Sequence, residues 1–559
     1  NFTTTTNAYN VAVGSAAGGA VTTGTLNTFI GGLAGDAVTT GRYNTSLGYQ
    51  SLSNETTGEF NTAIGYNALA TQNRTDGTDN YNTGVGASAG EQLTSGIQNT
   101  LIGGAAGDAL TASDYNVAVG YGALSSETLG ARNVAIGQEA LGSQNSTTAT
   151  TTYNTAVGMQ AGRLVTTGVE ITLLGALAGD ALTTGSYNVA VGKSSLSADT
   201  LGSKSVAVGN AALAAQNFTT ATDSFNTAVG HDAGNDLTTG TSNTLIGGLA
   251  GVSLTDADFN TAVGTQALTS DTLGSRTTAI GRFAGFNQNF TTASNSNNVY
   301  VGYYAGANVT TGTGNTLIGT EAGDAITDAD LNTALGTRAL GANQLGSYST
   351  AIGNDTLASQ NPATATNMFN VGVGSGAGNQ VTTGIQNTLI GGAAGDALTT
   401  GEDNVALGYA ALSSDDVGNH STAIGHGALF SQNYATATDS NNTAVGYNSG
   451  NAIETGIKNT FVGAFAGDGG AGQQENVAVG YGALSSNVGN QNIGVGSEAA
   501  NVLEGENNVM VGSQSGLIST SADNNTFVGH DSGVTNTTGD GNTFIGESVR
   551  GSSATVSTE

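Results

Sequence analysis

Few side chains in this sequence combine a reactive group with a spacing that supports catalysis. Cysteine is absent, and the four histidines are scattered without a partner motif. The histidines are His231, His420, His426 and His530. The regular repeats offer neither a pair of carboxylates for acid–base chemistry nor a cluster of basic residues. The glycines that close each repeat, such as Gly14 and Gly65, lead into strand-like sequence and not into a helix, so they form no phosphate-binding loop. We expect that the protein is not an enzyme.

One series of aspartates recurs with the 72-residue period of the chain, and Val252 interrupts it. Its members are Asp36, Asp108, Asp180, Asp324, Asp396 and Asp468. Calcium takes six to eight oxygen ligands. Like carboxylates one period apart would lie about 19 Å from each other in a stacked strand array, so only a local cluster such as Asp108 with Asp114 could contribute. We expect no cofactor, with calcium as the remaining alternative to a turn-stabilising Asp that follows Gly.

A second series with the same period consists of asparagines in Asn-x-Ser/Thr sequons. They are Asn1, Asn73, Asn145, Asn217 and Asn289. These asparagines belong to four-residue insertions, such as Gln72–Thr75 and Gln216–Thr219. Insertions of solenoids map to loops on one face, often the binding face. Two interpretations stay open: a polar turn copied by duplication, or a site of glycan attachment.

The composition excludes several classes of partner. Only 9% of the 559 residues are charged, the net charge is −30, and there are eleven Lys and Arg in total. Nucleic-acid binding needs a basic surface, and an anionic membrane surface is disfavoured for the same reason. No apolar run approaches the length of about 18 residues that a membrane-spanning helix needs, so we expect no membrane insertion. Acidic repeats rich in Gly, Thr and Asn favour a location outside the cell, at the cell surface, or on a virion.

These side chains are carried by a repeat with the pattern Asn-Thr/Val-x-Val/Ile-Gly. It occurs 31 times, beginning at Asn10 and ending with the copy at Asn542. Three 17-residue steps and one 21-residue step form a 72-residue cycle, which runs six times before the copy at Asn442. Near the C-terminus two 16-residue steps occur. Gly and β-branched residues saturate the unit, which favours a short strand ending in a turn over a helix.

The repeat predicts an all-β fold, a parallel β-solenoid (β-roll) rod of about 31 coils, with 17-residue coils in a 72-residue super-repeat. A single coil cannot bury its own aliphatic residues, but stacked coils bury a continuous column. We expect the core column at the fourth position, formed by Val13, Ile30, Leu47, Ile64, Val85 and Ile102. The asparagines of the first position are expected to hydrogen-bond along the axis. Five copies lack this Asn: Ile171, Ser205, Thr277, Ser349 and Ser421.

Two features of the organisation follow from the spacing. Residues 1–491 are predicted to form the regular solenoid with 72-residue modules, and residues 492–559 to form coils of altered spacing with a tail. Aromatic residues precede the Asn mainly at alternate copies, as at Tyr43, Tyr81 and Tyr115. One coil could therefore contain one repeat or two.

The units Asn133–Gly137 and Asn476–Gly480 (Asn-Val-Ala-Ile/Val-Gly) resemble the head repeats of YadA-type trimeric autotransporter adhesins and the related repeats of phage tail fibres. The resemblance covers roughly residues 7–550. It implies a parallel β-roll, usually trimeric, that acts as a surface-binding rod. The familiar head repeat is shorter than the repeat of this chain, and the 72-residue module is not part of its pattern.

The sequence thus predicts an extracellular structural or adhesive fibre that attaches to surfaces or forms filaments. The expected partners are copies of itself, as a trimer by resemblance or as a head-to-tail filament, and a cell-surface or glycan receptor. A bacteriophage tail fibre that binds a host receptor is the alternative. Ice binding is a more remote one, because the Thr pairs, such as Thr39–Thr40, would point to opposite faces of a strand.

Overall fold

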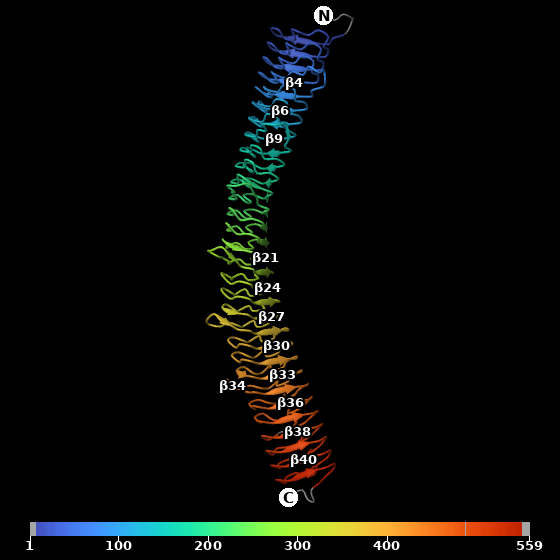
Figure 1. Ribbon diagram of the computed structural model, residues 1–559, viewed down its shortest axis with the longest axis vertical. Helices are drawn as coiled ribbons and strands as arrows, with labels where there is room; N and C mark the ends of the chain where they lie inside the picture. The colour runs from blue at the N-terminus through green and yellow to red at the C-terminus, as the bar shows by residue number, and fades with distance from the viewer. Residues whose placement is uncertain (1–6, 487, 551–559) are drawn as a thin grey trace. The chain divides into compact units, whose positions relative to one another are not determined.

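The computed structural model describes residues 7–486 and 488–550 (Figure 1). All regular secondary structure among these residues is β, and the predicted parallel β-solenoid of about 31 turns is confirmed. The chain divides into two compact units: the described residues up to Arg276 with Phe290–Ser294, and Thr277–Asn289 with the described residues from Asn295 onward. Within each unit, successive coils stack one on the next (Figure 1). The predicted boundary at residue 491 stays a prediction.

Each repeat contributes one three-residue strand at its second to fourth positions. In the first unit these strands are β1 (Val11–Val13), β2 (Thr28–Ile30), β3 (Thr45–Leu47), β4 (Thr62–Ile64), β5 (Thr83–Val85), β6 (Thr100–Ile102), β7 (Val117–Val119), β9 (Val134–Ile136), β11 (Thr155–Val157), β12 (Thr172–Leu174), β13 (Val189–Val191), β15 (Val206–Val208), β17 (Thr227–Val229), β18 (Thr244–Ile246) and β19 (Thr261–Val263). In the second unit they are β21 (Thr278–Ile280), β23 (Val299–Val301), β24 (Thr316–Ile318), β25 (Thr333–Leu335), β27 (Thr350–Ile352), β29 (Val371–Val373), β30 (Thr388–Ile390), β31 (Val405–Leu407), β33 (Thr422–Ile424), β35 (Thr443–Val445), β36 (Thr460–Val462), β37 (Val477–Val479), β38 (Ile493–Val495), β39 (Val509–Val511), β40 (Thr526–Val528) and β41 (Thr543–Ile545).

The pairing register shows that one repeat is one coil. Strand β1 pairs in parallel with β2, and Val11 lies opposite Thr28, one 17-residue step away. The 21-residue step keeps the same register, with Thr62 opposite Thr83, so the extra residues bulge outside the sheet. The 16-residue step does so as well, with Val477 opposite Ile493. The alternative prediction that one coil contains two repeats is therefore wrong.

The insertions build small strands of their own. Five pairs of positions carry two-residue strands: β8 (Gly130–Ala131) and β10 (Thr150–Thr151), β14 (Gly202–Ser203) and β16 (Thr222–Asp223), β20 (Gly274–Ser275) and β22 (Ser294–Asn295), β26 (Gly346–Ser347) and β28 (Thr366–Asn367), β32 (Gly418–Asn419) and β34 (Thr438–Asp439). Strand β8 pairs in parallel with β10, as do β14 with β16, β26 with β28, and β32 with β34. The longer coil is thus anchored to the coil before it.

The core is formed by the third position of the repeat, and the predicted core column at the fourth position is wrong. Ala63 and Leu101 are fully buried, whereas Val13, Leu47 and Ile102 are exposed, and the other predicted members are only partly buried. The reason is the Asn at position one, which turns inward to hydrogen-bond. Strand side chains alternate between faces, so an inward first position places the third inward and the second and fourth outward.

Small and large side chains complement each other inside the coils. In the coil that begins at Asn99, Leu101 is buried with Ala106 and Leu110. In the next coil the third position is Ala118, and Leu124 supplies the bulk. Each coil therefore fills its interior with a few aliphatic groups, at the dense packing that protein interiors require.

The asparagine column forms the expected ladder. The Oδ1 atom of Asn44 accepts the backbone N–H of Asn61 at 2.9 Å, and Asn44 Nδ2 donates to the carbonyl of Gly58, also at 2.9 Å. In four of the five repeats that lack the Asn, Ser or Thr takes its place and a buried Gln from the insertion lies with it. Gln216, for example, donates to Ser205 Oγ at 2.8 Å and accepts from Asn226 Nδ2 at 2.9 Å. The polar interior therefore stays hydrogen-bonded, as buried polar groups require.

The Thr pairs also differ from the expectation. Thr39 and Thr40 lie in a bend and not in a strand, and both have solvent-accessible surface. The Thr39 hydroxyl donates to the carbonyl of Thr56 in the next coil at 3.0 Å. The two side chains do not point to opposite faces of a strand, and ice binding stays an untested alternative.

Adjacent substitutions in one strand will test the direction of the core. We expect Leu101→Asp to destabilise the fold by at least about 3 kcal/mol, because it buries an unpaired charge. Ile102→Asp, one residue later, should cost less than about 1 kcal/mol because its side chain faces outward. Thermal melts by circular dichroism with limited proteolysis compare them. A larger loss for Ile102→Asp would contradict the observed register.

The next two residues of this coil test the contact between backbones. A Cβ on Gly103, whose φ is 136°, would lie 2.4 Å from the carbonyl oxygen of Gly120. Gly103→Ala should therefore cost at least about 2 kcal/mol. The control is Gly104→Ala, whose Cβ would first meet the Tyr121 ring at 3.5 Å. We expect the control to change the unfolding free energy by less than about 0.5 kcal/mol. Equal melting temperatures would show that the coils can separate there.

Candidate functional site

The outer face of the main sheet carries aliphatic side chains at the fourth position and Thr or Val at the second. In the first unit the exposed members are Val13, Leu47, Ile102, Ile136, Leu174 and Ile246. In the second they are Ile280, Leu335, Leu407, Val462, Val479 and Ile545. Apolar side chains grouped on a protein surface make this face a candidate interaction site.

A column of residues beside this face, at the position before the Asn, is aromatic in some of the repeats, and we call these residues the aromatic column. The rings of Tyr43, Phe60 and Tyr81 are stacked, with centroids 4.8 and 4.9 Å apart. Farther along the same column, the Arg132 guanidinium lies 5.2 Å from the centre of the Tyr115 ring. Residues of this column have positive φ, 57° at Tyr43 for example, although they are not glycine. The stacked coils hold them in a conformation that ordinary side chains seldom adopt.

The insertions place most of the predicted sequons at the surface. Asn73, Asn145 and Asn217 are exposed, Asn289 is partly buried, and Asn1 lies outside the described residues. The Oδ1 atom of Asn145 accepts a hydrogen bond from the Thr128 hydroxyl at 3.0 Å. Exposure is what an acceptor Asn needs, and glycan attachment and a duplicated polar turn both stay open interpretations.

The interior beneath the insertions holds carboxylates that sequence reasoning missed. Glu55, Glu127, Asp199, Asp271 and Asp415 recur at 72-residue intervals and have no exposed surface. In one of these sites, Asp199 Oδ2 accepts from Gln216 Nε2 at 2.7 Å and Oδ1 accepts from the N–H of Gly202 at 3.0 Å. Burial raises the pKa of Asp199 and of Asp415. The signal in the sequence that could have revealed these sites is that the acids and the glutamines of the insertions recur with the same 72-residue spacing.

One module shows how the site works without the charge. Asn343 takes the place of the carboxylate there, and its Oδ1 accepts from the N–H of Gly346 at 2.9 Å. Its Nδ2 donates to the carbonyl of the same glycine at 2.7 Å. Gln360 then pairs with Ser349 and Asn370 and makes no bond to a carboxylate. A neutral amide is thus compatible with the fold.

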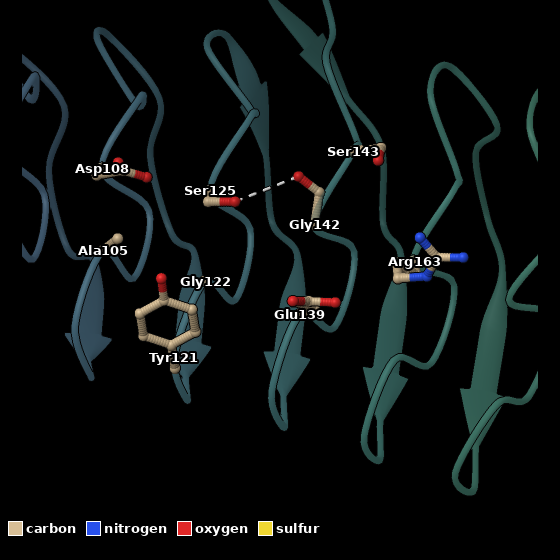
Figure 2. Close-up of a pocket in the computed structure, with 9 residues that line it drawn as sticks. All are labelled: Ala105, Asp108, Tyr121, Gly122, Ser125, Glu139, Gly142, Ser143 and Arg163. Atoms are coloured by element: carbon tan, nitrogen blue, oxygen red, sulfur yellow. Dashed lines mark hydrogen bonds between the residues drawn. The ribbon is translucent and has the colours of Figure 1, made fainter.

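The recurrent aspartates of the first series are partly buried and lie in a different part of the coil. Burial raises the pKa of Asp108, Asp180, Asp324, Asp396 and Asp468. Asp108 lines a hollow with Tyr121, Glu139 and Arg163 (Figure 2). Asp114, its expected partner for calcium, instead accepts the backbone N–H of Ile97 at 2.9 Å. Among the described residues, no group of three or more His, Cys, Asp or Glu side chains could hold a metal ion.

The histidines make contacts with neighbouring side chains. His231 Nδ1 lies 3.0 Å from an Asp232 oxygen, and His530 lies beside Asp531. His420 is near Asp403 and Asp439 in adjacent coils. His426 is stacked between the rings of Tyr409 and Tyr447. These contacts place a carboxylate or an aromatic ring beside each imidazole, and the absence of enzymatic activity stays a prediction.

Residues 7–486 and 488–550 contain no helix that could cross a membrane. In comparisons with known proteins, no protein-family model matches the chain, and no significant match occurs among curated proteins.

The buried carboxylates predict how stability depends on pH. A folded-state pKa raised above the unfolded value means that the fold binds the proton more tightly, so stability is lost as pH rises through the folded pKa. We expect the melting temperature to increase as pH falls from 7 toward 5, and this gain to end below the unfolded Asp pKa of about 3.9.

A double variant isolates the contribution of Asp199 and Asp415. Asp199→Asn with Asp415→Asn should reduce the slope of melting temperature against pH, since Asn343 shows that the site accepts an amide, and the partly buried aspartates with raised pKa should keep the rest of the slope. Asp236→Asn with Glu504→Gln removes the same charge from exposed positions and should leave the slope near that of the wild type. The measurement is calorimetry across pH 4–8. If both variants have the same slope, the buried pair is not its source.

Proposed function

We propose that this chain is an extracellular structural and adhesive fibre that assembles with copies of itself and displays its turns to a surface receptor. The observation that carries the proposal is the outward aliphatic column at the fourth position. Ile102 is 39% exposed and Leu174 is 49% exposed, and the same position is aliphatic in all 31 repeats. Isolated exposed aliphatics are ordinary, but a continuous column is typical of a surface that another protein covers.

A second copy of the chain fits this face by shape and chemistry. The face repeats with the coil, so a parallel copy in register would meet it with the same spacing from strand to strand. Charge is sparse on it, since the second and fourth positions are Thr or aliphatic in almost every strand. The resemblance to YadA-type head repeats supports a parallel trimer. A role as a bacteriophage tail fibre would use the same face and the same assembly.

Adhesion is proposed for the remaining surfaces. Weak contacts repeated once per module would add up through multivalency when the fibre lies along a surface. Turns and insertions, which the sheet face leaves free, are where solenoids place their binding residues. An external location, on a cell or a virion, agrees with the low charge and the exposed Asn and Thr residues of the insertions.

Charge placed on the sheet face should dissolve the assembly without unfolding the coils. The variant carries Ile64→Lys, Val85→Glu, Ile102→Lys and Val119→Glu, so that neighbouring strands present opposite charges. We expect the wild type to have a multiple of the chain mass by light scattering. The variant should shift to the mass of one chain, because closing the interface would remove four charged side chains of each copy from water.

The control keeps the charge change away from the sheet. Ala149→Lys with Ala221→Glu places charges on exposed residues of two 21-residue coils, just after the insertions, and should leave the assembly intact. Circular dichroism verifies that both variants keep their β structure. A wild-type chain that is monomeric at all concentrations would contradict self-assembly through this face.

A further inference from the structure

Two hollows with the same construction occur on the turn side of the coils, away from the second and fourth positions that form the sheet face. The first has a volume of about 380 Å³ and is lined by Asp108, Tyr121, Ser125 and Glu139 (Figure 2). The second has a volume of about 330 Å³ and is lined by Asp468, Tyr481, Ser485 and Glu498. These volumes are at the lower end of the range for small-ligand sites.

The four residues correspond one by one. The Asp, Tyr and Ser of the second hollow each come five modules after their counterparts in the first, whereas Glu498 comes one position earlier than that spacing predicts. A coil shortened by one residue precedes Glu498, yet the structure brings its side chain to the same hollow. The arrangement is therefore kept despite a change in spacing.

Simple copying of the module does not account for the pair. In three intervening modules the Tyr is replaced by Lys193, Thr265 and Thr337. The Glu is replaced by Ala211, Phe283, Asp355 and Gly427 in the modules between. Only at the two hollows do all four side chains occur together among the described modules.

The glutamates are held in place by the same contact in both hollows. Gln160 Nε2 donates to Glu139 Oε2 at 2.9 Å, and Gln514 Nε2 donates to Glu498 Oε2 at 2.8 Å. In each case one carboxylate oxygen is fixed by a neighbouring coil. A glycine follows each Tyr: an added Cβ on Gly122 would lie 3.6 Å from Glu139 Cγ, and one on Gly482 would lie 3.8 Å from Glu498 Cγ. The glycine keeps the space between Tyr and Glu open.

The remaining groups offer hydrogen-bond acceptors, donors and an aromatic surface. Asp108 Oδ1 is buried without a hydrogen-bond partner. The Ser125 hydroxyl donates to the Gly142 carbonyl at 3.3 Å, the interaction drawn in Figure 2. Tyr121 is 66% exposed and Tyr481 is 57% exposed, and the Tyr481 ring makes a T-shaped contact with Phe465, with the ring centroids 5.9 Å apart. In the first hollow, Arg163 Nε is a further buried atom without a partner.

We propose that the two hollows are binding sites for the sugar rings of a saccharide. Carboxylates accept hydrogen bonds from sugar hydroxyls, and such charge-assisted bonds are stronger than neutral ones. The exposed Tyr ring packs on the apolar C–H face of a sugar. In the first hollow a sugar hydroxyl also accepts a hydrogen bond from the unpartnered Arg163 Nε, which the ammonium group of a simple amine cannot do because it has no acceptor.

This inference rests on the proposed adhesive function and assigns its ligand class. Two hollows on one chain, multiplied by the copies in an assembly, would turn weak contacts with single sugars into firm attachment to a glycan-covered surface. Binding by a single chain does not depend on assembly, so the two proposals can fail separately.

The test uses the full chain and free hexoses. Galactose, glucose, mannose and N-acetylglucosamine are each titrated with saturation-transfer difference NMR, with lysine methyl ester as the amine probe. We expect at least one hexose to bind. Tyr121→Ala with Tyr481→Ala should weaken its binding at least 10-fold, and Glu139→Gln with Glu498→Gln should also weaken it.

Tyr187→Ala is the matched control, since it removes an exposed ring from the aromatic column beside the sheet. Binding should be unchanged in this variant, and circular dichroism should show that all variants are folded. Absence of hexose binding, an equal loss in Tyr187→Ala, or preferential binding of lysine methyl ester would each overturn the proposal. Light scattering on the same samples reports assembly. Hexose binding by a monomeric wild type would contradict the proposed self-assembly but not the saccharide sites. Assembly without hexose binding would contradict the saccharide sites but not the self-assembly.

Discussion

Every coil depends on the backbone of the next one, and the closeness of that contact governs the rest of the structure. The N–H of Gly65 donates to the carbonyl of Leu47 at 2.8 Å, and this pattern continues from coil to coil. At the fifth position the backbones approach so closely that a Cβ on Gly65 would lie 2.4 Å from the next glycine carbonyl. Because a coil has too little interior to be stable alone, the coils of each unit must stack without interruption and with uniform spacing.

The interior of the coils contains many polar side chains. The asparagine ladder occupies one column of the interior, and its amides satisfy backbone groups that would otherwise be buried without partners. In the module that contains Ser205, the Asn of the ladder is replaced by this Ser, which forms a hydrogen-bonded group with Gln216 and Asp199. Some of the carboxylates of this chain are thus buried, and hydrogen bonds from backbone N–H groups and Gln compensate for their lost hydration.

The inward asparagines have a consequence for the outside. Strand alternation places the aliphatic fourth position on the surface, next to a column of aromatic rings. This face is suited to a second copy of the chain, while the turns carry the hollows and the insertions carry the exposed asparagines. In the proposed fibre, assembly and recognition would therefore use different sides of the same coil.

The regularity of the repeat was sufficient to predict the fold class, the number of coils and the ladder of asparagines, because stacking demands the same residue at the same place in every coil. The sequence did not show which face of each strand points toward the core. An aliphatic column such as that containing Ile64 and Ile102 is normally assigned to a core, and only the inward bonds of the asparagines show that Ala63 and Leu101 form it instead.

The candidate sites were predicted less well. The aspartate series was visible in the sequence, but its relation to Tyr121 and Glu139 was not, since these residues belong to successive coils. Stacking sets which side chains of different coils become neighbours, and that depends on the path of the backbone around each turn.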